Sequence, residues 1–241
     1  MGRHGTIAGR KAAQDSKRAA LFTKYTRAIM MAAKAGGDPE YNASLKNAIE
    51  KAKAINLPND KITRAIKKGT GELEGETYET VTFEGYGPGG VAVVVETLTD
   101  NKNRTTSAVK HIFDKHSGNL GVPGCVAYMF ERKGIILIEQ GAGIDEDALL
   151  ETALDAGAED MKTEDEYFEI VTSTEDFPAV ADALRDAGYA LLEADIEQVP
   201  NIETEPKNDS ELKSLVKLID ALDDNDDVQK VYTNSSVDTS E

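Results

Sequence analysis

The charge of this chain reverses sign close to residue 70, and that reversal limits how the chain can fold. Residues 1–70 contain 15 Lys and Arg against 5 Asp and Glu, a net charge of +10. Residues 71–241 contain 12 against 39, a net charge of −27. An asymmetry of this size indicates separate bodies with different partners. The basic body is suited to binding phosphates, and the acidic body would be repelled by them.

The spacing of apolar residues changes at the same place. In the basic segment it is helical, with Phe22, Tyr25 and Ile29 on one stripe of the first helix. Helices are predicted over residues 10–35, 42–56 and 59–69. Because isolated helices of this length are marginal in water, their apolar stripes are expected to pack together as a basic helical domain.

From residue 78 onward, strands alternate with helices. The first group of predicted elements consists of strands 78–85 and 91–99, a helix at 104–116 and a strand at 125–130. The next group consists of strand 135–139, helix 145–156, strands 158–162 and 167–173, helix 175–187 and strand 190–198. This second group has the βαββαβ order of a ferredoxin-like fold. The first group lacks a second helix and a closing strand. A last helix, 210–222, and a last strand, 228–232, supply them.

The sequence therefore predicts an α+β multidomain protein, in which a three-helix domain precedes two α+β domains. The expected boundaries are 1–72 for the basic all-helical domain and 132–204 for the acidic ferredoxin-like domain. The ferredoxin-like domain is inserted into a discontinuous α+β domain formed by residues 78–131 and 205–241.

Several classes of protein are disfavoured by composition. Cys125 is the only cysteine, which excludes a disulfide framework and a zinc site of several cysteines. The three histidines have no metal-ligand spacing, and no pair of titratable residues suggests acid–base catalysis. There is no apolar signal segment and no run of about 18 apolar residues. We expect a cytoplasmic protein that is not an enzyme, with no cofactor, no metal and no membrane partner.

The basic segment is the candidate nucleic-acid-binding surface, because an excess of cations supplies phosphate affinity that is independent of sequence. Its candidate contacts are Arg10, Lys11, Lys17, Arg18, Lys24, Arg27, Lys34, Lys61, Arg64, Lys67 and Lys68. A secondary contact is predicted where a strand meets a helix, at Asn101, Lys102, Asn103 and Arg104. The alternative for this second group is ordinary turn and helix-cap chemistry. The acidic run 223–227 is interpreted as a solvated helix end.

Motifs along nearly the whole chain resemble the YebC/PmpR family. They include Arg10-Lys11-Ala12-Ala13-Gln14-Asp15, Gly36-Gly37-Asp38-Pro39, Tyr86-Gly87-Pro88-Gly89-Gly90, Gly118-Asn119-Leu120-Gly121 and Asp226-Asp227-Val228-Gln229-Lys230-Val231-Tyr232. The resemblance implies a helical first domain, two α+β domains and a cytoplasmic DNA-binding transcriptional regulator. Some relatives, including the mitochondrial translational activator of cytochrome oxidase, are similar instead to ribosome-associated translation factors.

Two functions therefore remain open. The first is a DNA-binding transcriptional regulator that works with the transcription machinery. The alternative is a translation factor or translational activator that contacts ribosomal or transfer RNA on the ribosome. The acidic remainder of the chain would be pushed away from duplex DNA but could face basic ribosomal proteins.

Overall fold

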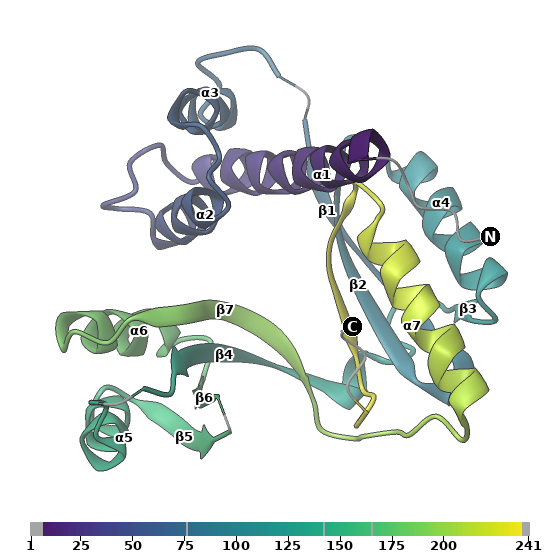
Figure 1. The fold of residues 1–241 in the computed structure, drawn as a ribbon. Coiled ribbons are helices and arrows are strands. Elements are labelled where there is room, and N and C mark those ends of the chain that lie inside the picture. The colour runs from purple at the N-terminus through teal and green to yellow at the C-terminus, as the bar shows by residue number, and fades with distance from the viewer. Residues whose placement is uncertain (1–6, 76, 142, 165, 238–241) are drawn as a thin grey trace. The chain divides into compact units, whose positions relative to one another are not determined.

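Two compact units make up the protein in a computed structural model (Figure 1). The model describes residues 7–75, 77–141, 143–164 and 166–237, with side chains from residue 18 onward. One unit combines Met1–Ala127 with Thr204–Glu241, and the other is Tyr128–Glu203. The second unit thus interrupts the first in sequence.

The N-terminal segment folds into three helices, as predicted. They are α1 (Ile7–Ala33), α2 (Ala43–Ala54) and α3 (Asn59–Gly69). Their common core includes the fully buried side chains of Ile29 and Leu45. At Gly69, a Cβ atom would collide with the carbonyl oxygen of Met30, so the end of α3 lies directly against the backbone of α1. This close approach requires glycine.

The helical core continues beyond the three helices. Tyr78, just before the first strand, and Leu98, near the end of the second, belong to the same buried cluster as Ile29. The helical segment is therefore joined to the following sheet through a shared apolar core.

That sheet is antiparallel, with the strand order β3-β1-β2-β8. Its strands are β1 (Glu79–Tyr86), β2 (Ala92–Thr99), β3 (Asn119–Leu120) and β8 (Val228–Thr233). The turn between β1 and β2 contains Gly89 at φ 76°, in the left-handed region that favours glycine. Strand β8 comes from the end of the chain and pairs with β2, which is buried along most of its length.

Two helices cover one face of this sheet, α4 (Lys102–Lys115) and α7 (Asp209–Asp223) (Figure 1). Phe113 of α4 and Leu218 of α7 are fully buried in one cluster with Phe83 and Val95 from the sheet. Glu84 fixes the segment that leads toward the second unit, because its carboxylate accepts hydrogen bonds from three backbone N–H groups of residues 124–127. Burial alone would raise the pKa of Glu84, but these three bonds outweigh it and lower the pKa.

The second unit is a four-stranded antiparallel sheet with the order β5-β6-β4-β7. Its elements are β4 (Phe130–Glu139), α5 (Glu146–Asp155), β5 (Ala158–Thr163), β6 (Tyr167–Thr172), α6 (Phe177–Asp186) and β7 (Leu191–Pro200). Ile136, Ile138 and Ile170 from the strands pack with Leu149 and Leu184 from the helices. The predicted fold class, a helical N-terminal region followed by α+β domains, is confirmed.

Two predicted strands differ from the structure. The predicted strand 125–130 is wrong, because Ala127–Met129 form a short 3-10 helix and only Phe130 belongs to a strand. The predicted strand 135–139 is part of a longer one, since β4 runs without a break from Phe130 to Glu139 and pairs with β7. Gly134 interrupts the apolar pattern there, since a Cβ atom at this position would collide with Thr172 and Phe177. The short third strand of the first sheet is β3, within a stretch predicted as a loop.

Candidate nucleic-acid interface

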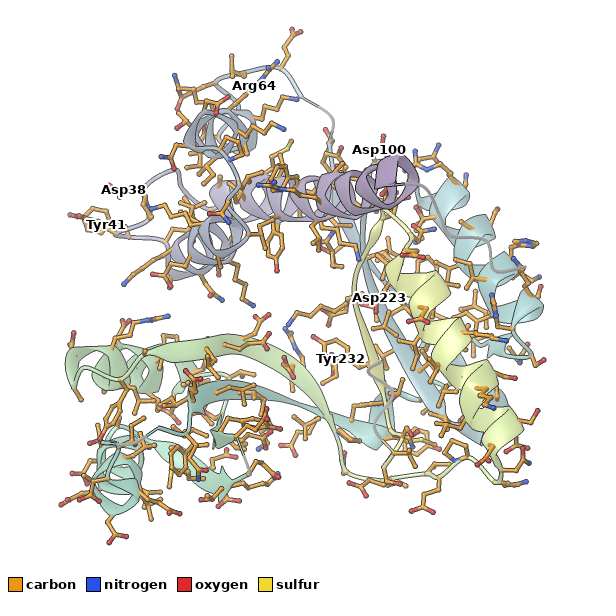
Figure 2. The ribbon with its side chains drawn as sticks, viewed as in Figure 1. Asp38, Tyr41, Arg64, Asp100, Asp223 and Tyr232 are labelled. Atoms are coloured by element: carbon orange, nitrogen blue, oxygen red, sulfur yellow. The ribbon has the colours of Figure 1, made fainter. Side chains whose placement is uncertain are left out.

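Helix α3 presents a row of cations on its solvent side. Ile62 and Ala65 are buried against the other helices, while Lys61, Arg64 and Lys67 are exposed. Figure 2 shows Arg64 among the outward side chains of α3. Residues three and four positions apart share one side of a helix, so these cations form a continuous surface. We call Lys61, Arg64, Lys67 and the half-buried Lys68 the α3 cationic face.

Within the described residues, the α3 cationic face has no acidic partner. Lys61 lies over the ring of Phe22, with Nζ 5.3 Å from the ring centre, and Arg18 lies at the same distance from that ring. Phe22 thus joins the α3 cationic face to α1. Lys67 and Lys68 also lie in the last turn of α3, where cations favour the negative end of the helix dipole.

The candidate cations in the second half of α1 have a different environment. Lys24 donates to the carbonyl oxygen of Asp223 (2.7 Å), and Lys34 donates to that of Tyr78 (2.8 Å). Arg27 donates to the carbonyl oxygen of Asp226 and pairs with a carboxylate oxygen of Asp227 (2.9 Å). These three cations are therefore engaged by the chain itself. The side chains of Arg10, Lys11 and Lys17 lie outside the described residues.

Asp227 is the centre of a buried polar network. Its side chain is only 8% exposed, and it accepts hydrogen bonds from Arg27, from Arg104 (3.1 and 2.9 Å) and from Thr105 (2.7 Å). With its proton on Asp227, the Thr105 hydroxyl accepts a hydrogen bond from the Thr99 hydroxyl (2.7 Å). Burial alone would raise the pKa of Asp227, but the bonds from Arg104 and Thr105 and the charges of the two arginines outweigh it and lower the pKa. We call Arg27, Asp227, Arg104 and Thr105 the Asp227 network.

Two residues of the predicted secondary contact, Asn101 and Arg104, bond to other groups of the same chain. Asn101 caps α4 by accepting from the backbone N–H of Arg104 (3.1 Å). Arg104 pairs with Asp100 (2.7 Å) as well as with Asp227. Lys102 and Asn103 remain exposed at the start of the helix. The helix-cap interpretation thus accounts for Asn101 and for much of Arg104.

Sequence reasoning missed the role of the acidic run 223–227, which was interpreted as a solvated helix end. Its backbone carbonyls and its one buried carboxylate, Asp227, hold the cations of α1. Figure 2 shows Asp223 at the end of α7 that faces α1. The available signal was charge, since four acids in five residues are complementary to the cations spaced along α1. We call residues 223–227 the acidic turn.

A cleft of about 430 Å³ opens beside the Asp227 network. Its lining includes Arg27, Tyr78, Asp100, Arg104 and Asp226. No group of His, Cys, Asp and Glu suited to a metal ion occurs among the residues that the structure describes. The same residues include no helix that is both long and apolar enough to span a membrane.

The chain is an α+β multidomain protein, because a basic three-helix segment is followed by two antiparallel sheets with their helices. Comparison with known families identifies it further. Residues 3–72 match the model described as the TACO1/YebC protein N-terminal domain, and residues 78–235 match that of the TACO1/YebC second and third domain. The chain belongs to the TACO1/YebC family, which confirms the resemblance noted from its motifs.

Individual relatives agree with this assignment over nearly their full length. A probable transcriptional regulatory protein of Clostridioides difficile (strain 630) is 56% identical over 238 residues, covering 98% of this chain and 100% of that protein. One from Acetivibrio thermocellus is 51% identical over 229 residues, covering 95% of each. A crystal structure of a conserved hypothetical protein, Aq1575, from Aquifex aeolicus has a TM-score of 0.83 at 45% identity, over 92% of this chain and 91% of that one.

Proposed function

We propose that this protein is a non-catalytic, nucleic-acid-binding regulator of gene expression, in the first instance a DNA-binding transcriptional regulator. The observation that carries the proposal is the α3 cationic face, whose cations are exposed and have no acidic partner in the described part of the chain. The names of the relatives, which describe probable transcriptional regulatory proteins, favour the same role.

Affinity of this kind arises mainly from the release of counterions when Lys and Arg neutralise phosphates. It positions a protein on the nucleic acid without reading its sequence. Neither Asn nor Gln stands next to Arg64 on α3, although such residues commonly read adenine in the major groove. The proposed contact is therefore to the phosphate backbone.

The test replaces Lys61, Arg64, Lys67 and Lys68 with Gln in the full chain. Binding to a 20-base-pair DNA duplex and to a 20-nucleotide RNA is measured over a range of salt concentrations. Because each phosphate contact contributes about 0.9 to the log–log salt slope on duplex DNA, the slope should fall by about 3–4. Circular dichroism checks that helix content is kept, since Gln is a good helix former.

A matched control changes four exposed lysines of α4 and α7 to Gln, namely Lys110, Lys115, Lys213 and Lys217. It removes the same charge from the same chain, so it should lower the slope by less than about 1. Equal losses in the two variants would contradict the assignment to α3.

The charge of the second unit favours the alternative function, a translation factor on ribosomal or transfer RNA. Residues 128–203 contain 4 Lys and Arg against 21 Asp and Glu, a net charge of −17. Such a body is repelled by duplex DNA but is complementary to basic proteins.

Fractionation of a cell lysate separates the two functions. Co-sedimentation with ribosomes that is lost at moderate salt would support the translation factor. Recovery with chromosomal DNA, and absence from the ribosomal fractions, would support the transcriptional regulator.

A further inference from the structure

Two cations of the basic segment are held by the chain's own acidic turn. Lys24 and Arg27 are three residues apart on α1 and reach the carbonyl oxygens of Asp223 and Asp226. Arg27 also pairs with the carboxylate of Asp227. The acidic turn thus supplies the oxygen acceptors and negative charge that a phosphate would supply.

Lys24 and Arg27 lie on the same helix as the residues that adjoin the α3 cationic face. Phe22 is within two residues of Lys24, and its ring lies beneath both Lys61 of α3 and Arg18 of α1. Residues two apart on a helix point to different sides, so Lys24 and Arg27, if released from the acidic turn, would form a second cationic surface on α1.

The contacts with the acidic turn satisfy both cations incompletely. The Nε of Arg27 is buried and has no hydrogen-bond acceptor within the described residues. Burial lowers the pKa of Lys24, and the nearby carboxylates of Asp223, Asp224 and Asp226 offset only part of this effect. Both observations indicate that these side chains are held at a cost in solvation.

Asp227 would keep its other partners if Arg27 turned away. Arg104 bonds to both of its oxygens, and Thr105 donates to one of them. The exchange therefore leaves no buried carboxylate without a partner, which is the usual penalty for breaking such a pair. The cleft beside Arg27 and Asp226 gives an oxygen ligand room to enter. Release of Arg27 would also break its contact with the ring of Tyr78, whose centre lies 5.1 Å from the guanidinium carbon. The apolar cluster that joins Tyr78 and Leu98 to α1 contains neither Lys24 nor Arg27.

We propose that the acidic turn regulates the nucleic-acid surface by competing with phosphate oxygens for Lys24 and Arg27. The inference rests on the proposed function, and it adds that two of the cations are released only when nucleic acid binds or when the turn loses its charge.

Asp227→Asn in the full chain tests this competition, with Asp226→Asn as the matched control. Both substitutions remove one negative charge from the acidic turn, but Asp226 contacts Arg27 through its backbone carbonyl, which Asn retains. Each variant is titrated with the same 20-base-pair DNA and 20-nucleotide RNA over a range of salt. Asp227→Asn should bind about tenfold more tightly than Asp226→Asn at 0.1 M salt, with a similar salt slope on DNA, because the same cations reach phosphates in both complexes. Agreement of the two variants within twofold, or weaker binding by Asp227→Asn, would overturn the proposal.

A second pair of variants keeps the test decisive if Asp227→Asn does not fold. Lys24→Gln is compared with Lys53→Gln, which removes an exposed lysine from α2. Lys24→Gln should lose about 0.9 of the salt slope on DNA if Lys24 transfers to a phosphate, and the control should lose much less. Equal losses would again overturn the proposal. The proposed function fails separately, if the four-residue variant of α3 binds as the wild type does.

Discussion

Helices α1 and α3 carry the same kind of pattern, an apolar stripe with lysines and arginines on the other side, but their cations have different fates. Lys24, Arg27 and Lys34 of α1 bond to groups of the same chain. Lys61 and Arg64 of α3 remain exposed and have no acidic partner within the described residues. A basic helix face thus indicates that anions will be bound, and it does not say whether they come from a ligand or from the protein itself.

The largest expected effect is a loss of stability when the carboxylate that binds Arg27 of α1 is removed. Asp227→Ala removes an acceptor that Arg27, Arg104 and Thr105 share, and it leaves the largely buried guanidinium of Arg27 without a carboxylate partner in the described residues. The free energy of unfolding should fall by about 3 kcal/mol, which urea denaturation can measure. The control is Asp224→Asn, at an exposed position two residues after the buried Leu222. Its free energy of unfolding should stay within about 0.5 kcal/mol of the wild type. Similar losses in both would show that Asp227 is no more important than its neighbours.

The next effect tests the packing that holds α3 against α1. In Gly69→Ala, the added methyl group would collide with the carbonyl oxygen of Met30 and with Ala33. Overpacking of this kind should cost about 2 kcal/mol of unfolding free energy. Thermal unfolding followed by circular dichroism measures it. A variant as stable as the wild type would mean that α3 can move away from α1 without loss.

A smaller effect concerns pH. Since the pKa of Asp227 is lowered in the folded protein, its ionised form stabilises the fold above the ordinary Asp value of about 3.9. That contribution is lost as the pH falls through the lowered pKa. The stability difference between the wild type and Asp227→Asn should therefore shrink steadily below pH 4, as measured by urea unfolding at several pH values. A difference that stays constant down to pH 2 would contradict an ionic role for Asp227.

The smallest effect on stability is expected on the α3 side. Single changes Lys61→Gln and Arg64→Gln remove exposed charges and should alter the unfolding free energy by less than about 0.5 kcal/mol. Each should nevertheless lower the salt slope of DNA binding by about 0.9. A large loss of stability in either variant would place that residue with the structural cations of α1.

The sequence predicted the helices and most strands because apolar spacing reports directly on the buried side of each element. The prediction was wrong where the choice of a residue depends on a contact with another residue far away in the sequence. Residues 131–134 were left between two predicted strands, yet they lie inside β4, where Gly134 is in close contact with Phe177. Strand β3 has two residues, which is too short to carry a period.

The candidate site could be predicted only in part, for the same reason. Charge alone located the basic segment, and the exposed residues of α3 follow from the helical period. Nothing local to α1 indicates that Arg27 pairs with a carboxylate 200 residues away. That contact depends on β8 pairing with β2, which brings the acidic turn to the second half of α1.

The separation of Arg27 and Asp227 along the chain also sets an order of events during protein synthesis. At about 5–20 residues per second, the 200 residues between them take about 10–40 s to be made. Through that interval the newly made α1 has no acidic turn to bind, and its cations are presented to the polyanions around the translating ribosome. Residues 128–203 are contiguous and can fold as they emerge, whereas the first sheet stays one strand short until β8 is released. The protein therefore passes through a more basic, incomplete form each time it is synthesised.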